Sequence, residues 1–252
     1  MKSVMFAAVV AAAAMASAPA FAQGFVGAQV GHTNVDVGSY SVDGNVYDVF
    51  GKVVTPLNDT LAFQFDGDVN WNDIEGLDHS AAGGAAVHLY RETPANKVGV
   101  FGGVGAENGD NLWYGGVEAQ VFASDNFDMA GSLGYFNDDQ VDVEGWAVGG
   151  TGTLFLNDNF DVFANAGFAR ADVLSMNDVK GWNGGVGLEY QMSGAPISIY
   201  GAYDHTDIDD LDAKADTVSV GITYSWSGSL RERQHRGPSL PGLSGVASAF
   251  RF

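Results

Sequence analysis

Residues 60–71 read TLAFQFDGDVNW, a stretch in which apolar and polar side chains alternate. Successive side chains of a β-strand point in opposite directions, so Leu61 and Phe65 share one face and Gln64 and Asp66 share the other. No stretch after residue 22 approaches the roughly 20 consecutive apolar residues that a membrane-spanning helix needs. If this chain enters a membrane, it must therefore do so through strands.

The same alternation recurs throughout residues 23–226, in segments separated by turn-forming residues. We count twelve strand-like segments and regard ten to fourteen strands as compatible with the pattern. The predicted strands cover residues 24–34, 45–55, 60–71, 79–91, 97–106, 111–123, 127–137, 143–156, 159–170, 179–192, 196–205 and 216–226. The predicted fold class is all-β, and because the sequence has no cysteine, no disulfide can hold it together.

The connections between these strands alternate in length. Those after every second strand are tight turns such as TPAN and NDN, whereas most of the others are longer and acidic, such as TDIDDLDAKAD. Short turns at one end and long loops at the other describe an antiparallel up-and-down meander. Both ends of the meander are expected on the short-turn side.

Large aromatic residues help to separate a membrane barrel from a soluble sandwich or lipocalin-like barrel, which would bury the same apolar faces inside. On the apolar faces, one group of rings gathers near the long-loop end, and a second group, including Phe63 and Tyr190, gathers near the short-turn end. Two such levels match the two interfaces of a membrane, whereas a soluble core would scatter its rings. The predicted girdle at the long-loop end consists of Tyr47, Trp71, Trp113, Tyr135, Trp146, Phe168, Trp182 and Tyr203.

The beginning of the chain has the pattern of a secretory signal peptide. Lys2 precedes an apolar run, and the sequence AFA supplies a small-residue cleavage pattern immediately before Gln23. We therefore predict a signal peptide (1–22), a barrel (23–226) and a basic C-terminal tail (227–252).

Together, the signal peptide, alternating strands, aromatic levels and loop asymmetry resemble the outer-membrane β-barrel, porin-like proteins of Gram-negative bacteria, over residues 1 to about 226. The resemblance implies a transmembrane antiparallel barrel in the cell outer membrane, delivered by the barrel-assembly machinery and in contact with outer-membrane lipid and lipopolysaccharide. Members of such families often end in a strand whose last residue is aromatic. Both Trp226 and the stretch GVASAFRF, with Phe250 and Phe252, could fill that role, and Trp226 is favoured because it ends a fully alternating strand. The Pro-bearing tail that follows lacks alternation and is predicted to be a disordered periplasmic appendage.

The charge of the predicted barrel bears on its partners. Residues 23–226 hold six basic and 30 acidic residues, a net charge of −24, which argues against nucleic acid because a phosphate backbone needs Lys and Arg. Carboxylates around a water-filled passage attract cations, so the sequence predicts a porin-like channel for passive diffusion of small cationic or neutral solutes. The predicted pore-lining residues are Gln29, Lys52, Gln64, Asp66, Asp68, His88, Glu118, Gln120, Asn183 and Glu189, with Asp128, Glu144 and Asn165 expected on the same faces.

Two other functions stay open from the sequence. A plugged barrel in which Lys52 pairs with carboxylates would conduct nothing, and could be a structural or adhesive surface protein that binds ions, lipopolysaccharide or a host partner. A rim hydrolase would need Asp204 and His205 to converge, although adjacent residues of a strand point to opposite faces. No Ser/His/Asp or metallohydrolase pattern occurs, so we expect neither enzyme chemistry nor a cofactor.

The last long loop is the only candidate for metal binding that the sequence offers. The stretch DHTDIDDLDAKAD is rich in aspartate but lacks the central Gly and terminal Glu of an EF-hand. Asp207, Asp209, Asp210 and Asp212 are therefore weak metal candidates, and a solvated acidic surface is expected instead.

Overall fold

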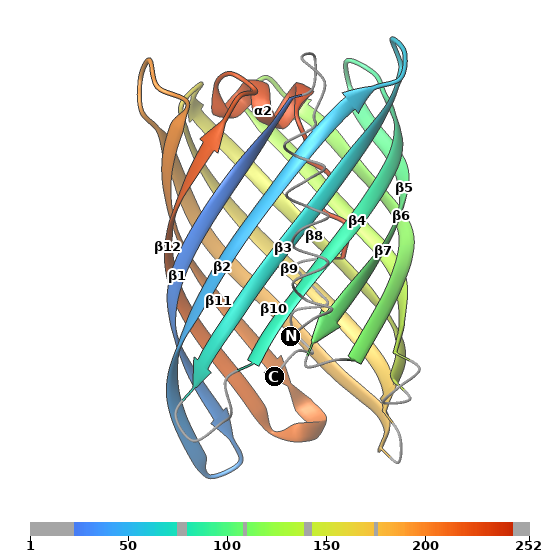
Figure 1. Ribbon diagram of the computed structural model, residues 1–252, viewed down its shortest axis with the longest axis vertical. Coiled ribbons are helices and arrows are strands. Elements are labelled where there is room, and N and C mark those ends of the chain that lie inside the picture. Colours follow the sequence, from blue (N-terminus) through green and yellow to red (C-terminus); the bar gives the residue numbers. More distant parts are fainter. Residues whose placement is uncertain (1–22, 75–79, 108–109, 139–142, 174–175, 244–252) are drawn as a thin grey trace.

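The computed structural model describes residues 23–74, 80–107, 110–138, 143–173 and 176–243, so the predicted signal peptide lies outside the described part. Within that part the chain forms one closed barrel in which each strand pairs antiparallel with its neighbours in sequence and β1 closes the ring against β12 (Figure 1). The strands are β1 (Gln23–Val37), β2 (Tyr40–Pro56), β3 (Leu61–Ile74), β4 (Ser80–Glu92), β5 (Asn96–Glu107), β6 (Asp110–Ser124), β7 (Phe127–Asp138), β8 (Val143–Asn157), β9 (Phe160–Val173), β10 (Met176–Gln191), β11 (Ile197–Ile208) and β12 (Ala213–Ser225). The predicted fold class and the predicted twelve strands are confirmed.

Several strands run further toward the long-loop end than the alternation predicts. β1 and β2 keep pairing up to Val37 and Tyr40, around a tight turn in which Gly38 has a φ of +60° that favours glycine. β11 and β12 likewise pair up to Ile208 and Ala213, on either side of the short 3-10 helix η1 (Asp209–Leu211). Strand pairing uses main-chain groups, so it continues where the apolar alternation has already ended.

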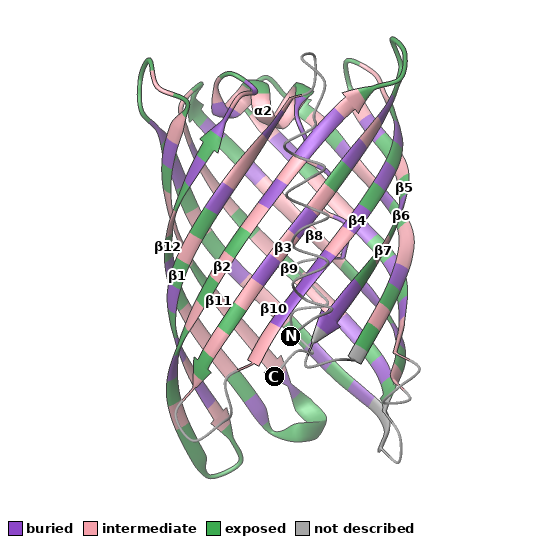
Figure 2. Cartoon of the chain, viewed as in Figure 1, coloured by how far each residue is buried: buried purple, intermediate pink, exposed green. Residues whose placement is uncertain are grey.

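The outer face of the barrel is apolar. Exposed and buried residues alternate along the strands (Figure 2), and exposed large side chains such as Val104, Val117 and Val220 point away from the interior. A continuous apolar surface of this kind requires hydrocarbon around it, and a closed ring leaves no strand edge unpaired there. The strands are therefore the membrane-spanning elements.

The structure places all eight predicted girdle residues on this outer face. Seven of them have between 40% and 47% of their surface exposed, and the half-buried Phe168 packs against Trp146 with ring centroids 5.5 Å apart. Cross-strand pairing sets Tyr47 directly opposite Trp71. The rings therefore gather near the long-loop end, as an interfacial girdle requires.

The C-terminal segment differs from its prediction. Helix α2 (Leu230–Arg236) begins at a capping box formed by Ser229 and Glu232 and lies at the end of the barrel where β1 begins and β12 ends (Figure 1). After α2 the chain turns into the barrel interior, where the side chains of Leu240 and Leu243 are fully buried. None of the helices in the described residues is long and apolar enough to cross a membrane.

We call residues 227–243 the plug. The prediction of a disordered appendage is wrong for this segment, while residues 244–252 lie outside the described part. The segment lacks periodicity because it is neither a strand nor a long helix. What orders it is complementarity to the distant barrel wall, and a local sequence pattern does not reveal that.

Candidate functional site

The candidate site is the inner wall of the barrel together with the plug. All ten predicted pore-lining residues lie on strand positions that alternate with the exposed outer positions, and so they face inward. Most of them, however, contact the plug or one another. The sequence therefore identified the wall but not its occupant.

An ion pair anchors helix α2 to β10. The Arg233 guanidinium donates to both carboxylate oxygens of Glu189, with Nη1 2.9 Å from Oε1 and Nη2 2.5 Å from Oε2. The hydroxyls of Ser198 and Thr223 also donate to Glu189, and the guanidinium lies 4.9 Å from the centre of the Phe25 ring. Burial by itself would lower the pKa of Arg233, but the Glu189 carboxylate outweighs it and raises that pKa above its usual range. Arg233 is thus a permanent cation held in a fixed position.

Two further pairs hold the helix. The His235 Nε2 atom lies 3.3 Å from a carboxylate oxygen of the buried Asp128, and the His235 ring packs on Phe122 with centroids 4.5 Å apart. At the rim, Arg231 lies 3.2 Å from Asp158 in a much more exposed pair. The pairs that face the interior therefore dominate the anchoring, since exposed ion pairs contribute little.

Lys97 on β5 contacts the plug but is not among the predicted pore-lining residues. It is fully buried, and its Nζ donates to the carbonyl oxygens of Gln234 (3.3 Å) and Gly237 (2.9 Å) and to the Ser239 hydroxyl (2.8 Å). A cation at this place satisfies the free carbonyls at the C-terminal end of α2. The available signal was its phase, because Lys97 alternates with outward Val98 and Val100.

The extended part of the plug is bound first at Leu240. The Gln64 side chain pairs with both main-chain groups of Leu240, donating to its carbonyl (2.9 Å) and accepting from its amide (3.2 Å). Lys52 donates to the same carbonyl at 3.1 Å. The Leu240 side chain fills a slot that includes Val54 and Tyr90.

The second binding point is Gly242. Its amide donates to Glu118 at 3.1 Å, and its carbonyl accepts from the Ser132 hydroxyl. Gly242 has a φ of +59°, and a Cβ atom added there would lie 3.1 Å from Cε1 of His88, so the position needs glycine.

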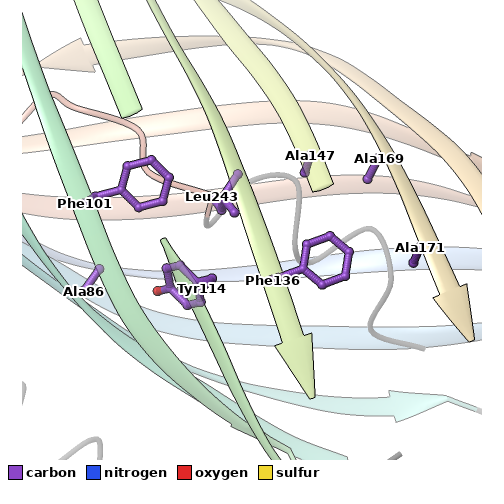
Figure 3. Packing of buried hydrophobic residues seen from close by; sticks show 8 residues of the cluster. All are labelled: Ala86, Phe101, Tyr114, Phe136, Ala147, Ala169, Ala171 and Leu243. Carbon is purple, nitrogen blue, oxygen red and sulfur yellow. The ribbon is translucent and has the colours of Figure 1, made fainter. Parts of the chain in front are cut away.

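Leu243 ends the described plug in an aromatic slot. Its side chain lies among Phe101, Tyr114 and Phe136 in the largest apolar cluster of the interior (Figure 3). Gly134 leaves the room for it, because an added Cβ would come within 2.8 Å of the Leu243 side chain.

A charged network on the wall connects the binding points at Leu240 and Gly242. Lys52 lies 2.8 Å from Asp66, which lies 3.3 Å from Nε2 of His88, and Nδ1 of His88 lies 2.7 Å from Glu118. The His88 and Glu118 side chains have no exposed surface. Buried charges are tolerated only when they are paired, so this network fixes the side chains that bind the plug.

Nearer the long-loop end the wall carries further polar groups, beyond the binding points described above. Gln29 accepts a hydrogen bond from Tyr200 at 2.8 Å, and Asp204 accepts one from Asn165 at 3.3 Å. Asp48 and Asp68 lie on the inner faces of the neighbouring strands β2 and β3. This part of the wall is acidic.

The structure corrects the predicted inward position of Glu144 and shows where Asp204 and His205 lie. Glu144 points outward and accepts a hydrogen bond from Tyr135 at 2.5 Å, because it shares the phase of the outward Trp146. His205 also lies on the outer face, where its Nδ1 is 2.8 Å from Asp216, whereas Asp204 points into the barrel. The Asp204 carboxylate and the His205 imidazole thus lie on opposite sides of the sheet. They cannot both reach one water molecule, as a water-activating pair must.

The weak metal candidates do not converge on one point. Asp207 pairs with Lys214 at 3.1 Å, and Asp210 accepts from the main-chain amide of Lys180 at 2.9 Å. Across the described ranges, no group of three or more His, Cys, Asp or Glu residues is arranged to hold a metal ion.

No protein-family model and no curated protein matches the sequence. Solved structures share its fold at low sequence identity. An outer membrane channel from Pseudomonas putida F1 aligns with a TM-score of 0.67 and 10% identity, covering 83% of this chain and 97% of that one. The KdgM porin in complex with disordered oligogalacturonate gives 0.51 and 10%, covering 79% and 99%, and the translocator domain of autotransporter NalP from Neisseria meningitidis gives 0.55 and 12%, covering 88% and 95%. The fold of this chain is that of the outer-membrane β-barrels.

Proposed function

We propose that this protein is an outer-membrane channel for small cationic or neutral solutes, and that the plug holds it closed in the conformation of Figure 1. The observation that carries the proposal is the charge of the inner wall. Among the described strand residues that face inward, two lysines, Lys52 and Lys97, stand against many carboxylates. These carboxylates include Asp48, Asp66, Asp68, Glu118, Asp128, Asp161, Glu189 and Asp204.

Burying carboxylates in a membrane-embedded interior is energetically unfavourable unless water, counter-ions or a partner segment contacts them. The arginines and histidine of the plug supply part of it in the closed state. With the plug displaced, the same carboxylates would attract cations from solution and repel anions. Two of the proteins that share the fold are described as an outer membrane channel and a porin, which agrees with this role.

Planar-bilayer recording on the full chain tests the proposal. The double variant Leu240→Asp with Leu243→Asp puts two carboxylates into apolar slots beside Glu118 and should expel the extended part of the plug. We expect the native protein to conduct little, and the variant to open with a reversal potential that favours cations. Leu211→Asp, the same change in the exposed η1 segment, is the matched control and should behave like the native protein.

Selectivity is tested separately from conductance. Asp66 is unsuitable for this test, because its charge is paired with Lys52 and its side chain accepts a hydrogen bond from Gln64, which binds the plug. Replacing Asp48 and Asp68 with asparagine in the opened variant should move the reversal potential toward zero. An unchanged reversal potential would remove the cation preference from the proposal and leave the channel.

A second candidate is favoured by the plug itself. The plug is bonded to β2, β3, β5, β6, β7 and β10, and a segment attached to this many strands would rarely leave, as expected for a non-conducting structural or adhesive surface barrel. In that case the acidic long loops, rather than the interior, would meet ions, lipopolysaccharide or a host molecule. An opened variant that is folded but electrically silent would establish this candidate over the channel.

A further inference from the structure

The barrel wall binds the plug largely through the plug's main chain. The carbonyl groups of Gln234, Gly237, Leu240 and Gly242, and the amides of the last two, are all bonded to side chains of the wall. Gln64 pairs with the amide and the carbonyl of one residue at once. Main-chain groups are common to every peptide, so this part of the recognition does not depend on which side chains the ligand carries.

The side-chain slots add a simple pattern. Leu240 and Leu243 occupy two apolar slots, and residues at positions three apart in an extended or turning segment would fill both. On the N-terminal side, Glu189 receives a guanidinium and Asp128 receives an imidazole. A matching ligand has basic residues followed by two apolar residues three positions apart, with glycine immediately before the second one.

We infer that the inner wall is a binding site for short peptides, and that the plug is a resident peptide ligand attached to the end of its own receptor. This inference deepens the proposed channel function and rests on it, because it names short basic and apolar peptides as the solute class. An inert filling could be held by apolar packing alone. Here side chains from β2, β3, β6 and β7 form hydrogen bonds with the amide and carbonyl groups of an extended chain.

The covalent link between barrel and plug prevents a free peptide from binding the wall. Only Trp226 to Ser229 separate the end of β12 from α2, so the effective concentration of the plug at its site is on the order of millimolar or higher. A peptide in solution cannot compete with a ligand tethered at that concentration. Cutting the tether after folding removes this advantage and leaves the wall intact.

The experiment therefore uses the full chain with a protease recognition sequence inserted after Gly228, which is exposed. The protein is folded, cut and washed in mild denaturant, and loss of the plug is followed by mass spectrometry. Binding of a fluorescent peptide, RERQHRGPSLPGL, is then measured by anisotropy in detergent. We expect saturable binding, and we expect a different peptide that keeps the basic residues, the two leucines and the glycine at position 242 to bind within about tenfold of it.

Two altered peptides test the mode of recognition. N-methylation at the Leu240 and Gly242 positions removes both amide donors and keeps the side chains, and should weaken binding at least tenfold. Aspartate at the two leucine positions should abolish it. On the wall, Gln64→Leu should weaken binding at least tenfold, whereas Gln29→Leu, which removes an inward glutamine bonded to Tyr200, should leave binding unchanged.

The outcomes are decisive in either direction. If the emptied barrel binds no peptide, or if N-methylated and native peptides bind equally, the peptide site does not exist as inferred. Because the readout is binding in detergent, it is independent of the bilayer recording. An opened variant that conducts while the emptied barrel ignores peptides overturns only this inference, whereas peptide binding to a barrel that never conducts overturns the channel.

Discussion

Arg233 of α2 and Glu189 of β10 form a two-point ion pair inside the rim of the barrel, with both side chains about nine-tenths buried. Glu189 is further fixed by two hydroxyls, and the aromatic ring of Phe25 faces the guanidinium. One element of the pair belongs to the membrane-spanning wall and the other to a segment outside it. The strength of this contact therefore decides how firmly the plug is seated.

The first prediction concerns that pair. Glu189→Gln keeps the size of the side chain but leaves the Arg233 charge buried without its counter-charge, and breaking a buried pair costs about 3–5 kcal/mol. The plug should open far more often, so trypsin should cleave at its arginines roughly 100-fold faster or more than in the native protein. The rate of appearance of the shortened chain measures this.

The control uses the exposed pair of the same helix. Arg231→Gln removes the contact with Asp158, which is largely exposed, and should change plug opening by no more than about 1 kcal/mol. If both variants open the plug equally, burial of the Glu189 pair is not what holds it.

The second prediction concerns the buried lysine. Lys97→Met keeps the apolar stem and removes the donor for the Gly237 carbonyl and the Ser239 hydroxyl, while the Gln234 carbonyl keeps its hydrogen bond from Gln120. Buried acceptors without a donor cost about 1–3 kcal/mol each, so the helix end should loosen. Hydrogen exchange at the amides around residue 237 should accelerate. Arg91→Met, an exposed cation of the neighbouring strand β4, should leave that exchange unchanged.

The third prediction uses two glycines with similar backbones. Gly242 and Gly194 both have positive φ, +59° and +76°, but an added Cβ meets His88 at the first and open space at the second. Both alanine variants incur a backbone cost of about 1–2 kcal/mol. Only Gly242→Ala should expose Leu243 and its slot, as read by protection of the plug from trypsin. Equal behaviour of the two variants would mean that Gly242 is not seated against His88.

The fourth prediction tests the lipid-facing assignment. Val117 lies exposed at the middle of β6, and a lysine there should cost about 2–4 kcal/mol in a bilayer. Unfolding in urea from lipid vesicles, followed by the heat-dependent shift on a gel, measures the loss. Leu211→Lys in the η1 segment should cost much less, because that position lies beyond the strands. A Val117→Lys variant as stable as the native barrel would contradict the membrane assignment.

Much of the fold could be read from the sequence, because strands in a barrel wall alternate with a period that local patterns record. The phase of β3, for example, puts Gln64, Asp66 and Asp68 on the inner face as predicted. The inward position predicted for Glu144 is wrong, and alternation itself argues against it, because Glu144 lies two residues before the outward Trp146. The strand ends are underestimated where main-chain pairing continues through polar residues such as Asp36 and Ser41, up to the pair Val37 and Tyr40.

The candidate site was predicted only in part. The acidic wall followed from alternation, but its occupant did not, because the plug contacts residues more than 100 positions away, as in the bond from Gln64 to Leu240. One global signal was present in the sequence, namely an acidic barrel followed by a basic tail. Complementary charge of this kind, rather than any local motif, points to Arg233 and His235 as ligands of the wall.

Because the plug follows β12 in the chain, it can bind the wall only after the barrel has closed. Its binding points lie on β2, β3, β6, β7 and β10, which face one another only when β1 and β12 have met. A chain stalled before ring closure would trail a basic, protease-sensitive end, whereas a finished one conceals it. Resistance of the plug to proteases would therefore report that the barrel has closed.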